Sequence, residues 1–418
     1  MRGLRSAILV ACTVLPATRA LALWDDKVTP FVEEKVTRDS NVFRLSPSLD
    51  PRTFAPDIFK DSTSLGDTYR VTSVGLNVDL PVSRQRFQLG YARNYSRYDH
   101  FTELDLDGYD GRALWLWQLG NDANGQLSYT ENLSLASFAN IAGVKPDPLK
   151  VRQAQLNGAY LVTPRWRLQL GATGFQQRNG ETTLRVNDID IVGGDASLDY
   201  ATPANTFVGV GVRAEDGRFP NRPFVPASSD PNVVPSVFDN AYRQYGVDLV
   251  ADWTVTGLSR LNARVGRISR RNEHLSERDF YGTAVRVQYD WKPTGRLSLN
   301  ASVVQDISPY DDIKASYVFV KGVSFRPTFA LTGKIDVSGI FEYSIRDYLG
   351  DPNLAPADTQ GTLPTRTDHV RSATLALSYR PIRVITLQAS AQRETRSSTI
   401  PFGDYEVNVY SLSARLAF

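Results

Sequence analysis

The chain is 418 residues long and almost balanced in charge, with 47 lysines and arginines against 45 aspartates and glutamates. This balance argues against nucleic acid as a partner, because surfaces that bind nucleic acid carry an excess of basic residues. Cys12 is the only cysteine, which excludes a disulfide-stabilised fold and a multi-thiolate metal site within the chain.

Residues 1–22 have the pattern of a secretory signal peptide. Two arginines precede an apolar stretch, Ala7–Leu15, and a small-x-small pattern of the kind that signal peptidase recognises ends at Ala22. We expect cleavage after Ala22, which leaves residues 23–418 as one exported domain. No later segment reaches the roughly 20 consecutive apolar residues of a membrane-spanning helix.

Strands with alternating polar and apolar residues occupy most of the remaining chain. The first is expected near Val28–Arg38, and the last ends at Phe418. Between them, period-two segments end at turn residues and new segments begin at once, so each turn marks one hairpin. We predict short turns near Pro81, Asn121, Pro164, Pro203, Gly257, Pro293, Pro327 and Pro381.

Much longer connections separate these hairpins, at residues 44–65, 217–239 and 346–366. Short turns that alternate with long loops are typical of bacterial outer-membrane barrels, in which the short turns face the periplasm. Eight short turns with an opening and a closing strand predict about 18 strands. A count of 16 is the alternative, because residues 182–192 could form a loop instead of a strand.

The strand that begins at Trp166 shows the alternation clearly. Trp166, Leu168 and Leu170 share one face, and Arg167 and Gln169 share the other. Successive side chains of a strand point to opposite faces, so a wall between lipid and a wet lumen needs this pattern. A soluble β-sandwich is the alternative, but faces rich in arginine, glutamine and aspartate could not be buried in one without partners.

Tryptophans with the parity of the lipid-facing side lie within a few residues of predicted short turns. We interpret them as the aromatic girdle at the periplasmic interface. The alternative is that they are core residues of a soluble all-β protein. The four tryptophans are Trp117, Trp166, Trp253 and Trp291.

The closing strand alternates in the same way and ends on an aromatic residue. Its apolar face carries Tyr410, Leu412, Leu416 and Phe418. We expect these residues to form the C-terminal signal for the barrel assembly machinery, although an edge strand of a soluble sandwich could show the same alternation. Residues 23–418 are therefore expected to fold as an all-β, transmembrane, antiparallel up-and-down barrel in Gram-negative outer-membrane lipid.

Charged residues with the opposite parity are predicted to line the pore. A wet wall of arginines, carboxylates and amides suits hydroxylated or anionic chains. The alternative is that these residues only fill and brace the lumen through mutual salt bridges. The candidates are Arg167, Asp248, Asp252, Arg264, Arg286, Asp290, Glu394 and Arg415.

Two substitutions would test which residues face lipid and which face the lumen. Leu299→Arg should impair assembly, because an arginine that faces lipid at mid-membrane costs about 2–4 kcal/mol. Arg264→Glu, which faces the lumen, should fold normally.

The sequence predicts no catalytic, metal or cofactor site, and we do not expect an enzyme. The three histidines are far apart and lack metal-ligand spacing, and no Gly-x-Ser-x-Gly motif occurs. The acidic segment 103–110 could bind calcium or be a solvated loop. A sequence that begins at Gly209 superficially resembles the dinucleotide-binding motif, but it lies in a predicted strand and no helix follows. We expect the glycines of this segment to relieve crowding inside a curved wall.

Short motifs near the start of the exported chain resemble one known family. Thr29-Pro-Phe-Val32, Asp39-Ser-Asn-Val-Phe-Arg-Leu45 and the closing strand resemble the EpsL family of porin-like outer-membrane proteins, which are encoded with exopolysaccharide biosynthesis systems. The resemblance implies a role in moving a newly made polysaccharide across the outer membrane. It also implies polysaccharide as substrate, and periplasmic and inner-membrane export components as partners.

The residues that match the signature of this family follow the first predicted strand. They could close the structure there or belong to a loop that folds over the pore. The matching residues are Asp39, Asn41, Phe43, Arg44 and Leu45.

The leading hypothesis is thus a conduit for exopolysaccharide export, with residues 217–239 as a constriction or gate. A general diffusion porin with the same wall is the alternative. An outer-membrane enzyme or a structural adhesin is favoured less than either.

Overall fold

The computed structural model describes residues 27–60, 62–140, 144–204, 206–222, 241–274, 276, 279–308, 317–349 and 366–418. The expected signal peptide, residues 1–22, lies outside these ranges. So does most of the expected gate at residues 217–239.

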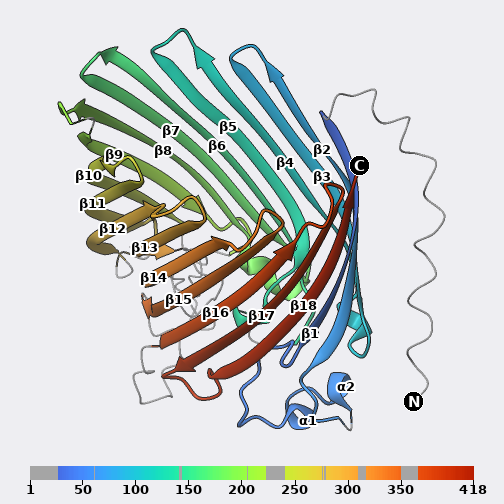
Figure 1. Cartoon of the computed structure of the whole chain (residues 1–418). Coiled ribbons are helices and arrows are strands. Elements are labelled where there is room, and N and C mark those ends of the chain that lie inside the picture. The colour runs from blue at the N-terminus through green and yellow to red at the C-terminus, as the bar shows by residue number, and fades with distance from the viewer. Residues whose placement is uncertain are drawn as a thin grey trace, which may run out of the picture.

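Within the described residues, eighteen antiparallel strands form one closed barrel (Figure 1). Strands that follow each other in the chain pair with each other, and β1 pairs with both β2 and β18, so the sheet closes on itself. The predicted up-and-down barrel of 18 strands is confirmed, and the alternative of 16 is wrong. The strands are β1 (Val28–Asp39), β2 (Asp67–Val82), β3 (Gln85–Tyr98), β4 (Leu106–Leu119), β5 (Ala123–Leu135), β6 (Pro148–Thr163), β7 (Trp166–Asn179), β8 (Ile189–Ala201), β9 (Phe207–Arg218), β10 (Tyr242–Thr256), β11 (Ser259–Asn272), β12 (Phe280–Trp291), β13 (Leu297–Ser308), β14 (Tyr317–Ala330), β15 (Ile335–Leu349), β16 (Thr367–Tyr379), β17 (Ile385–Ser398) and β18 (Tyr405–Ala417).

The seam between the first and last strands closes with regular pairing. Phe31 of β1 lies opposite Ala417 of β18 on one side and Gly75 of β2 on the other. The Phe418 amide donates to the carbonyl of Pro30 at 2.9 Å. Closure of this kind pairs the backbone groups of strands that would otherwise be sheet edges, which suits a wall in contact with lipid.

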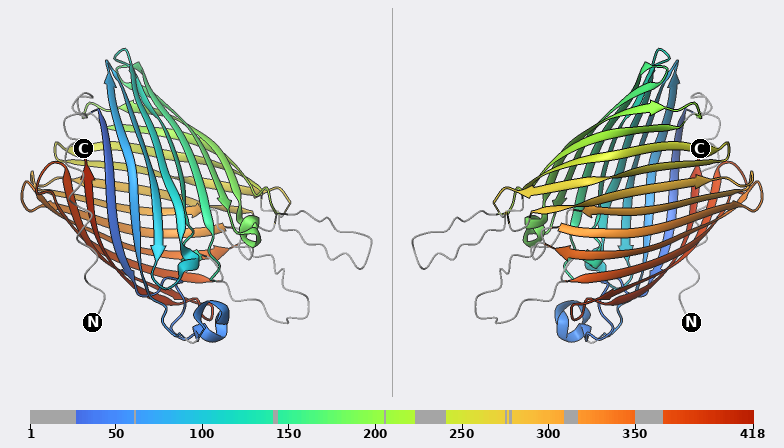
Figure 2. Two further views of the ribbon diagram at one scale, coloured as in Figure 1. Left: turned by 90° about the vertical axis from the view of Figure 1, so that its right-hand side faces the viewer. Right: turned by 90° about the vertical axis from the view of Figure 1, so that its left-hand side faces the viewer.

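Short turns join the strands at one end of the barrel, and the longer connections join them at the other (Figure 2). The turn predicted near Pro81 follows the end of β2 at Val82, but the position predicted near Pro327 needs correction, because Pro327 lies inside β14. The strand continues past Pro327, which lies opposite Leu299 of β13. The ladder between β14 and β15 is interrupted around Pro327, since proline has no amide hydrogen to donate.

The connection between β1 and β2 contains two short helices, α1 (Pro51–Phe54) and α2 (Pro56–Phe59). Single 3-10 turns occur in three other connections: η3 (Thr102–Leu104), η4 (Phe138–Asn140) and η5 (Thr182–Asn187). The region at residues 182–192 that was ambiguous in sequence is therefore a 3-10 turn followed by the start of β8. Among the described residues, no helix is long and apolar enough to cross a membrane.

Apolar side chains cover the outer face of the barrel. Each of the eighteen strands carries at least one exposed large apolar residue, and Leu249 on β10 is 66% exposed. Soluble monomers rarely expose contiguous apolar patches larger than a few hundred Å². An apolar surface that encircles the whole barrel is therefore suited to lipid and not to water.

Candidate functional site: the barrel lumen

The inner face of the barrel is identified by ion pairs between strands that are not neighbours. Arg167 on β7 lies 3.8 Å from Asp252 on β10, and Arg264 on β11 lies 3.7 Å from Asp195 on β8. Two strands separate the partners in each case. Side chains from such strands converge only on the concave side of a curved sheet, so these residues face the lumen.

One part of the inner face, which we call the braced wall, is a network of ion pairs on β7–β13. At its centre, Asp248 is 1% exposed and lies 3.5 Å from Arg213 and 3.7 Å from Arg264. The network holds equal numbers of arginines and aspartates, so its charges balance. Its members are Arg167, Arg213, Arg260, Arg264 and Arg286 with Asp195, Asp199, Asp248, Asp252 and Asp306.

Glycines on the inner face make room for these carboxylates. A Cβ atom at Gly266 would lie 2.2 Å from the Asp248 Oδ1 atom, and one at Gly209 would lie 2.4 Å from the Asp199 Oδ1 atom. Both distances are too short for any side chain, so the acid can lie against the wall only where the facing residue is glycine. The expectation that Gly209 relieves crowding inside the wall agrees with this geometry.

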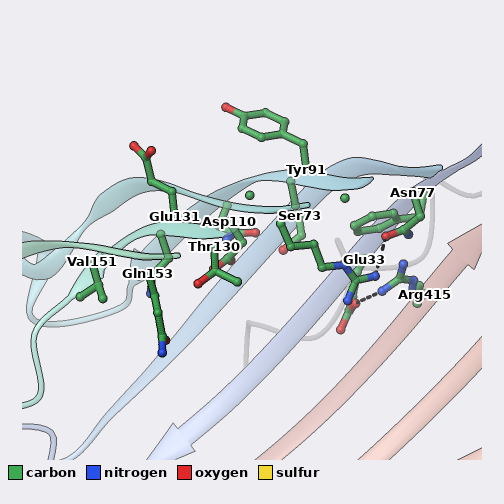
Figure 3. Close-up of a pocket in the computed structure, with 17 residues that line it drawn as sticks. Glu33, Ser73, Asn77, Tyr91, Asp110, Thr130, Glu131, Val151, Gln153 and Arg415 are labelled. Atoms are coloured by element: carbon green, nitrogen blue, oxygen red, sulfur yellow. Dashed lines mark hydrogen bonds and ion pairs between the residues drawn. The ribbon is translucent and has the colours of Figure 1, made fainter. Parts of the chain in front are cut away.

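Another part of the inner face, on β1–β6 and β18, contains a cavity of about 580 Å³ that we call the polar recess (Figure 3). Arg112 donates to the Asn77 side chain at 2.9 Å. Arg415 lies 3.7 Å from Glu33, and its guanidinium carbon lies 3.7 Å from the centre of the Phe31 ring. Hydroxyls, amides and a carboxylate complete the lining: Ser73, Asn94, Asp110, Thr130, Asn132 and Gln153.

Two further candidate residues accept hydrogen bonds from their neighbours. Asp290 accepts from Gln288 at 2.9 Å and from Asn300 at 2.6 Å, and Glu394 accepts from the Tyr405 hydroxyl at 2.6 Å. Strand register places all eight candidates on the inner face. They are Arg167, Asp248, Asp252, Arg264, Arg286, Asp290, Glu394 and Arg415.

The four tryptophans of the expected girdle lie on the outer face near the short turns. Trp166, Trp253 and Trp291 are each 41–44% exposed. Trp117 is less exposed, because its ring lies over two glycines on β5 and β6, where Cβ atoms at Gly125 and Gly158 would come within 2.4 and 3.2 Å of it. This position on the outer face agrees with a girdle at the short-turn end, which stays a prediction.

A fifth tryptophan of this kind was missed in the sequence. Trp115 on β4 is 39% exposed, stacks on Phe87 at 5.9 Å and donates to the Gln85 side chain at 2.9 Å. Its parity along the strand, shared with Trp117, could have revealed it.

At the end of the barrel with the longer connections, the described residues of three of them pack together into what we call the loop cap: residues 40–60, 62–66, 99–105, 136–140 and 144–147. Phe43 is its centre and is 1% exposed. Its ring makes edge-to-face contacts with Phe59, Phe101 and Phe138 at 4.8–5.4 Å. Each of these partners comes from a different element, α2, the residue before η3, and η4, so one aromatic cluster ties the three connections together.

The residues that resemble the EpsL signature build the base of this cap. Arg44 adopts a φ of 56° and its guanidinium lies 2.9 Å from the buried carboxylate of Asp39. Asn41 donates to the Leu45 carbonyl at 2.8 Å and to the Glu406 carbonyl of β18 at 3.2 Å. These contacts fix where the chain leaves β1, so the segment has a structural role at the seam and also anchors a cap over the lumen.

The loop cap lies across the mouth of the barrel. The Arg396 guanidinium on β17 donates to the Ala139 carbonyl in η4 and, at 2.7 Å, to the Gly403 carbonyl. Strands β18 and β1–β4 separate β17 from β5, the strand that leads into η4. A contact between β17 and η4 therefore requires the connection between β5 and β6 to extend inward across the barrel.

The sequence interpretation missed the aromatic partners of Phe43 and the role of Arg396. Phe59, Phe101 and Phe138 were the available signal, since large apolar residues are unusual in segments that otherwise read as polar loops. Nothing local to β17 marks Arg396 as a contact of a distant loop.

The histidines and acids considered in the sequence are placed as structural groups. His100 Nδ1 lies 2.9 Å from the fully buried Asp67 carboxylate. In the acidic segment, Asp107 pairs with Arg97 at 2.6 Å. Within the ranges that the structure describes, no group of three or more histidines, cysteines, aspartates and glutamates could hold a metal ion.

Comparison with known proteins finds no matching family model and no matching curated protein. Several crystal structures of porins share the architecture over nearly the whole chain. OpdK from Pseudomonas aeruginosa, solved with vanillate, is 10% identical with a TM-score of 0.46, covering 94% of this chain and 99% of that one. OccK2 (OpdF) from the same organism is 11% identical with a TM-score of 0.47, covering 94% and 98%. A BenF-like porin from Pseudomonas fluorescens Pf-5 is 11% identical with a TM-score of 0.47, covering 94% and 99%.

At such low identity and TM-scores, these likenesses carry no information about what this chain transports. Its function has to be argued from its own wall.

Proposed function

We propose that this chain is an outer-membrane channel of the porin kind, through which hydrophilic solutes diffuse along the lumen without any reaction being catalysed. The observation that carries this proposal is the contrast between its two faces. Apolar residues encircle the outside, and charged residues from non-adjacent strands meet on the inside. A wet lumen within a lipid-facing wall is the arrangement of a diffusion channel.

The polar recess supports a preference for hydroxylated or anionic solutes. Arg112 and Arg415 present guanidinium groups beside amides and hydroxyls in a cavity of about 580 Å³. Guanidinium binds carboxylate and sulfate groups through two parallel hydrogen bonds. In the braced wall each arginine is paired with an aspartate, whereas Arg112 in the recess donates to a neutral amide and Arg415 alone is paired, with Glu33.

Planar-bilayer recording tests the proposal. Purified protein should give discrete conductance steps in potassium chloride, and neutralising both Arg112 and Arg415 to glutamine should lower the permeability of anions relative to potassium. Arg93→Gln is the matched control, because Arg93 lies opposite the outward-facing Val74 and should leave selectivity unchanged. Absence of conductance from protein that is folded and inserted would refute the channel function.

A second candidate, polysaccharide export, is favoured by one observation. The segment that resembles the EpsL signature, Asp39 to Leu45, forms the base of the loop cap at the mouth of the barrel. If the channel passes a polymer, the cell's own exopolysaccharide should block the single-channel current, and cells that lack the protein should lose surface polysaccharide. Unchanged current and normal secretion would leave diffusion of small solutes as the function.

The proposed location requires insertion by the barrel assembly machinery. The residues of the expected C-terminal signal are exposed and lie on the outer face of β18 or directly after its end. They are Tyr410, Leu412, Leu416 and Phe418. We propose that periplasmic and inner-membrane export components take part only if the polymer function holds.

A further inference from the structure

Four arginines and one aspartate form a patch on the outer face of β9–β11, close to the loop end of these strands. They are Arg218, Arg243, Arg267, Arg271 and Asp216. Arg243 lies directly opposite Arg271 on one side and opposite Asp216 on the other. Arg243 also shares its face of β10 with the exposed residues Tyr245 and Val247, so the patch points away from the lumen.

The patch lies at the upper boundary of the apolar surface. Arg243 and Trp253 are ten residues apart on the same face of β10. With a rise of about 3.3 Å per residue and a tilt of about 45°, this separation is about 23 Å along the barrel axis. An apolar band of a barrel is about 25 Å tall, so with Trp253 at one interface, Arg243 reaches the headgroups of the other.

Among the residues that the structure describes, the positive charge of the patch is only partly balanced. Asp216 lies 2.8 Å from Arg218 and 3.6 Å from Arg243. Among the described residues, no carboxylate lies within ion-pairing distance of Arg267 or Arg271. The Arg243 side chain is 67% exposed, and it faces a like charge across the ladder, which destabilises a sheet unless an anion lies between the two.

Two other outward-facing arginines near this level are ion-paired. Arg178 on β7 lies 2.7 Å from Asp190, and Arg393 on β17 lies 2.7 Å from Glu406. Arg267 and Arg271 on β11 have no such carboxylate partner among the described residues, whereas Arg178 and Arg393 each have one.

We propose that this patch binds the phosphate groups of a phosphorylated glycolipid in the leaflet at the loop end of the barrel. Basic residues at headgroup level attract anionic lipids, and guanidinium groups bind phosphate through paired hydrogen bonds. The opposed Arg243 and Arg271 bring two such groups to one headgroup, and a phosphate between them offsets their repulsion. This inference rests on the proposed membrane location, but not on what passes through the lumen.

Native mass spectrometry of the full chain in detergent, with bisphosphorylated lipid A as the probe, tests the proposal. The protein should retain this lipid, and it should retain neither dephosphorylated lipid A nor inorganic phosphate. The double variant R243Q/R271Q should lower retention by about tenfold or more, as the loss of two basic residues at headgroup level predicts. The matched control R178Q/R393Q, which removes two paired arginines of the same rim, should retain the lipid as the parent does.

Equal retention by both double variants, or equal retention of dephosphorylated lipid A by the parent, would overturn the inference. Folding is judged by heat-modifiable electrophoretic mobility. If R243Q/R271Q does not fold, lipid retention is measured with the single variant R271Q instead. Conductance recorded from the same preparations keeps the two proposals apart. A conducting channel without selective lipid retention refutes only the lipid site, whereas selective retention by an inserted but non-conducting protein refutes only the channel.

Discussion

The assignment of inner and outer faces predicts opposite effects for two adjacent substitutions on β13. Val303 is 46% exposed on the outer face, and Ser302 lies on the inner face, where its hydroxyl is 2.8 Å from that of Ser324. Val303 lies four residues beyond Leu299, which is opposite Trp291 of the girdle, so it is about 9 Å into the apolar band. At that depth an arginine facing lipid costs about 2–3 kcal/mol, which lowers the folding equilibrium constant about 30- to 140-fold.

Reversible folding into lipid vesicles, followed by tryptophan fluorescence across a urea titration, measures this difference. Val303→Arg should lose the stated free energy, Ser302→Arg should fold within about 0.5 kcal/mol of the parent, and Leu299→Arg should cost about 0–1 kcal/mol. Equal losses at positions 302 and 303 would show that the inner and outer faces are wrongly assigned. Equal losses at 299 and 303 would refute the depth.

Three further outcomes follow from the inner wall and the loop cap. Gly266→Ala should destabilise the barrel by about 1–3 kcal/mol in the same titration, because its Cβ would lie 2.2 Å from the Asp248 Oδ1 atom; a neutral effect would refute the close contact. Phe43→Ala should lower the free energy of local unfolding of the cap by about 3–5 kcal/mol. Hydrogen exchange should then be faster at residues 99–105 and 136–147 and unchanged in the strands. Burial raises the pKa of Asp147 above its ordinary value of 3.8, so its contribution to the cap is fully present below that value and is lost as the pH rises through the raised pKa. The protection factor of the Glu181 amide, which donates to Asp147 at 2.8 Å, is the exchange rate corrected for the intrinsic effect of pH. It should therefore be higher at low pH than at pH 7, and Asp147→Asn should remove this pH dependence.

The strand count was predictable because it depends on local alternation. A strand such as β7 shows its two faces in its own sequence, with Trp166 and Leu168 on one face and Arg167 on the other. The positions of some turns were not predictable in the same way. Pro327 reads as a turn residue, but it lies within β14, where interrupted pairing with β15 accommodates it.

Depth within the membrane could not be read from the alternation. Leu299 has the parity of a lipid-facing residue, and the expectation for Leu299→Arg placed it at mid-membrane. The register places it opposite Trp291 at the interface, where the cost is much lower. Which face a residue occupies is a local property, but its depth depends on how far the partner strand is shifted.

The partners of inward-facing charges were equally hidden. Arg264→Glu was expected to fold normally because its side chain faces the lumen. The structure places Arg264 between Asp195 and the buried Asp248, so a glutamate there would add a third carboxylate where an arginine now balances two. We now expect this variant to be destabilised, since unpaired charges at buried positions are costly.

The braced wall and the polar recess differ in whether their charged groups can bind a solute. In the braced wall, Asp248 is held between Arg213 and Arg264, and binding a solute there would require breaking those pairs. In the polar recess, Arg112 is hydrogen-bonded only to a neutral amide, and the exchange of that bond for one to an anion would be favourable. A solute passing along the lumen would therefore gain most from the β1–β6 side. The connections of the loop cap join strands of β1–β6 as well, so the recess and the cap lie on the same side of the barrel.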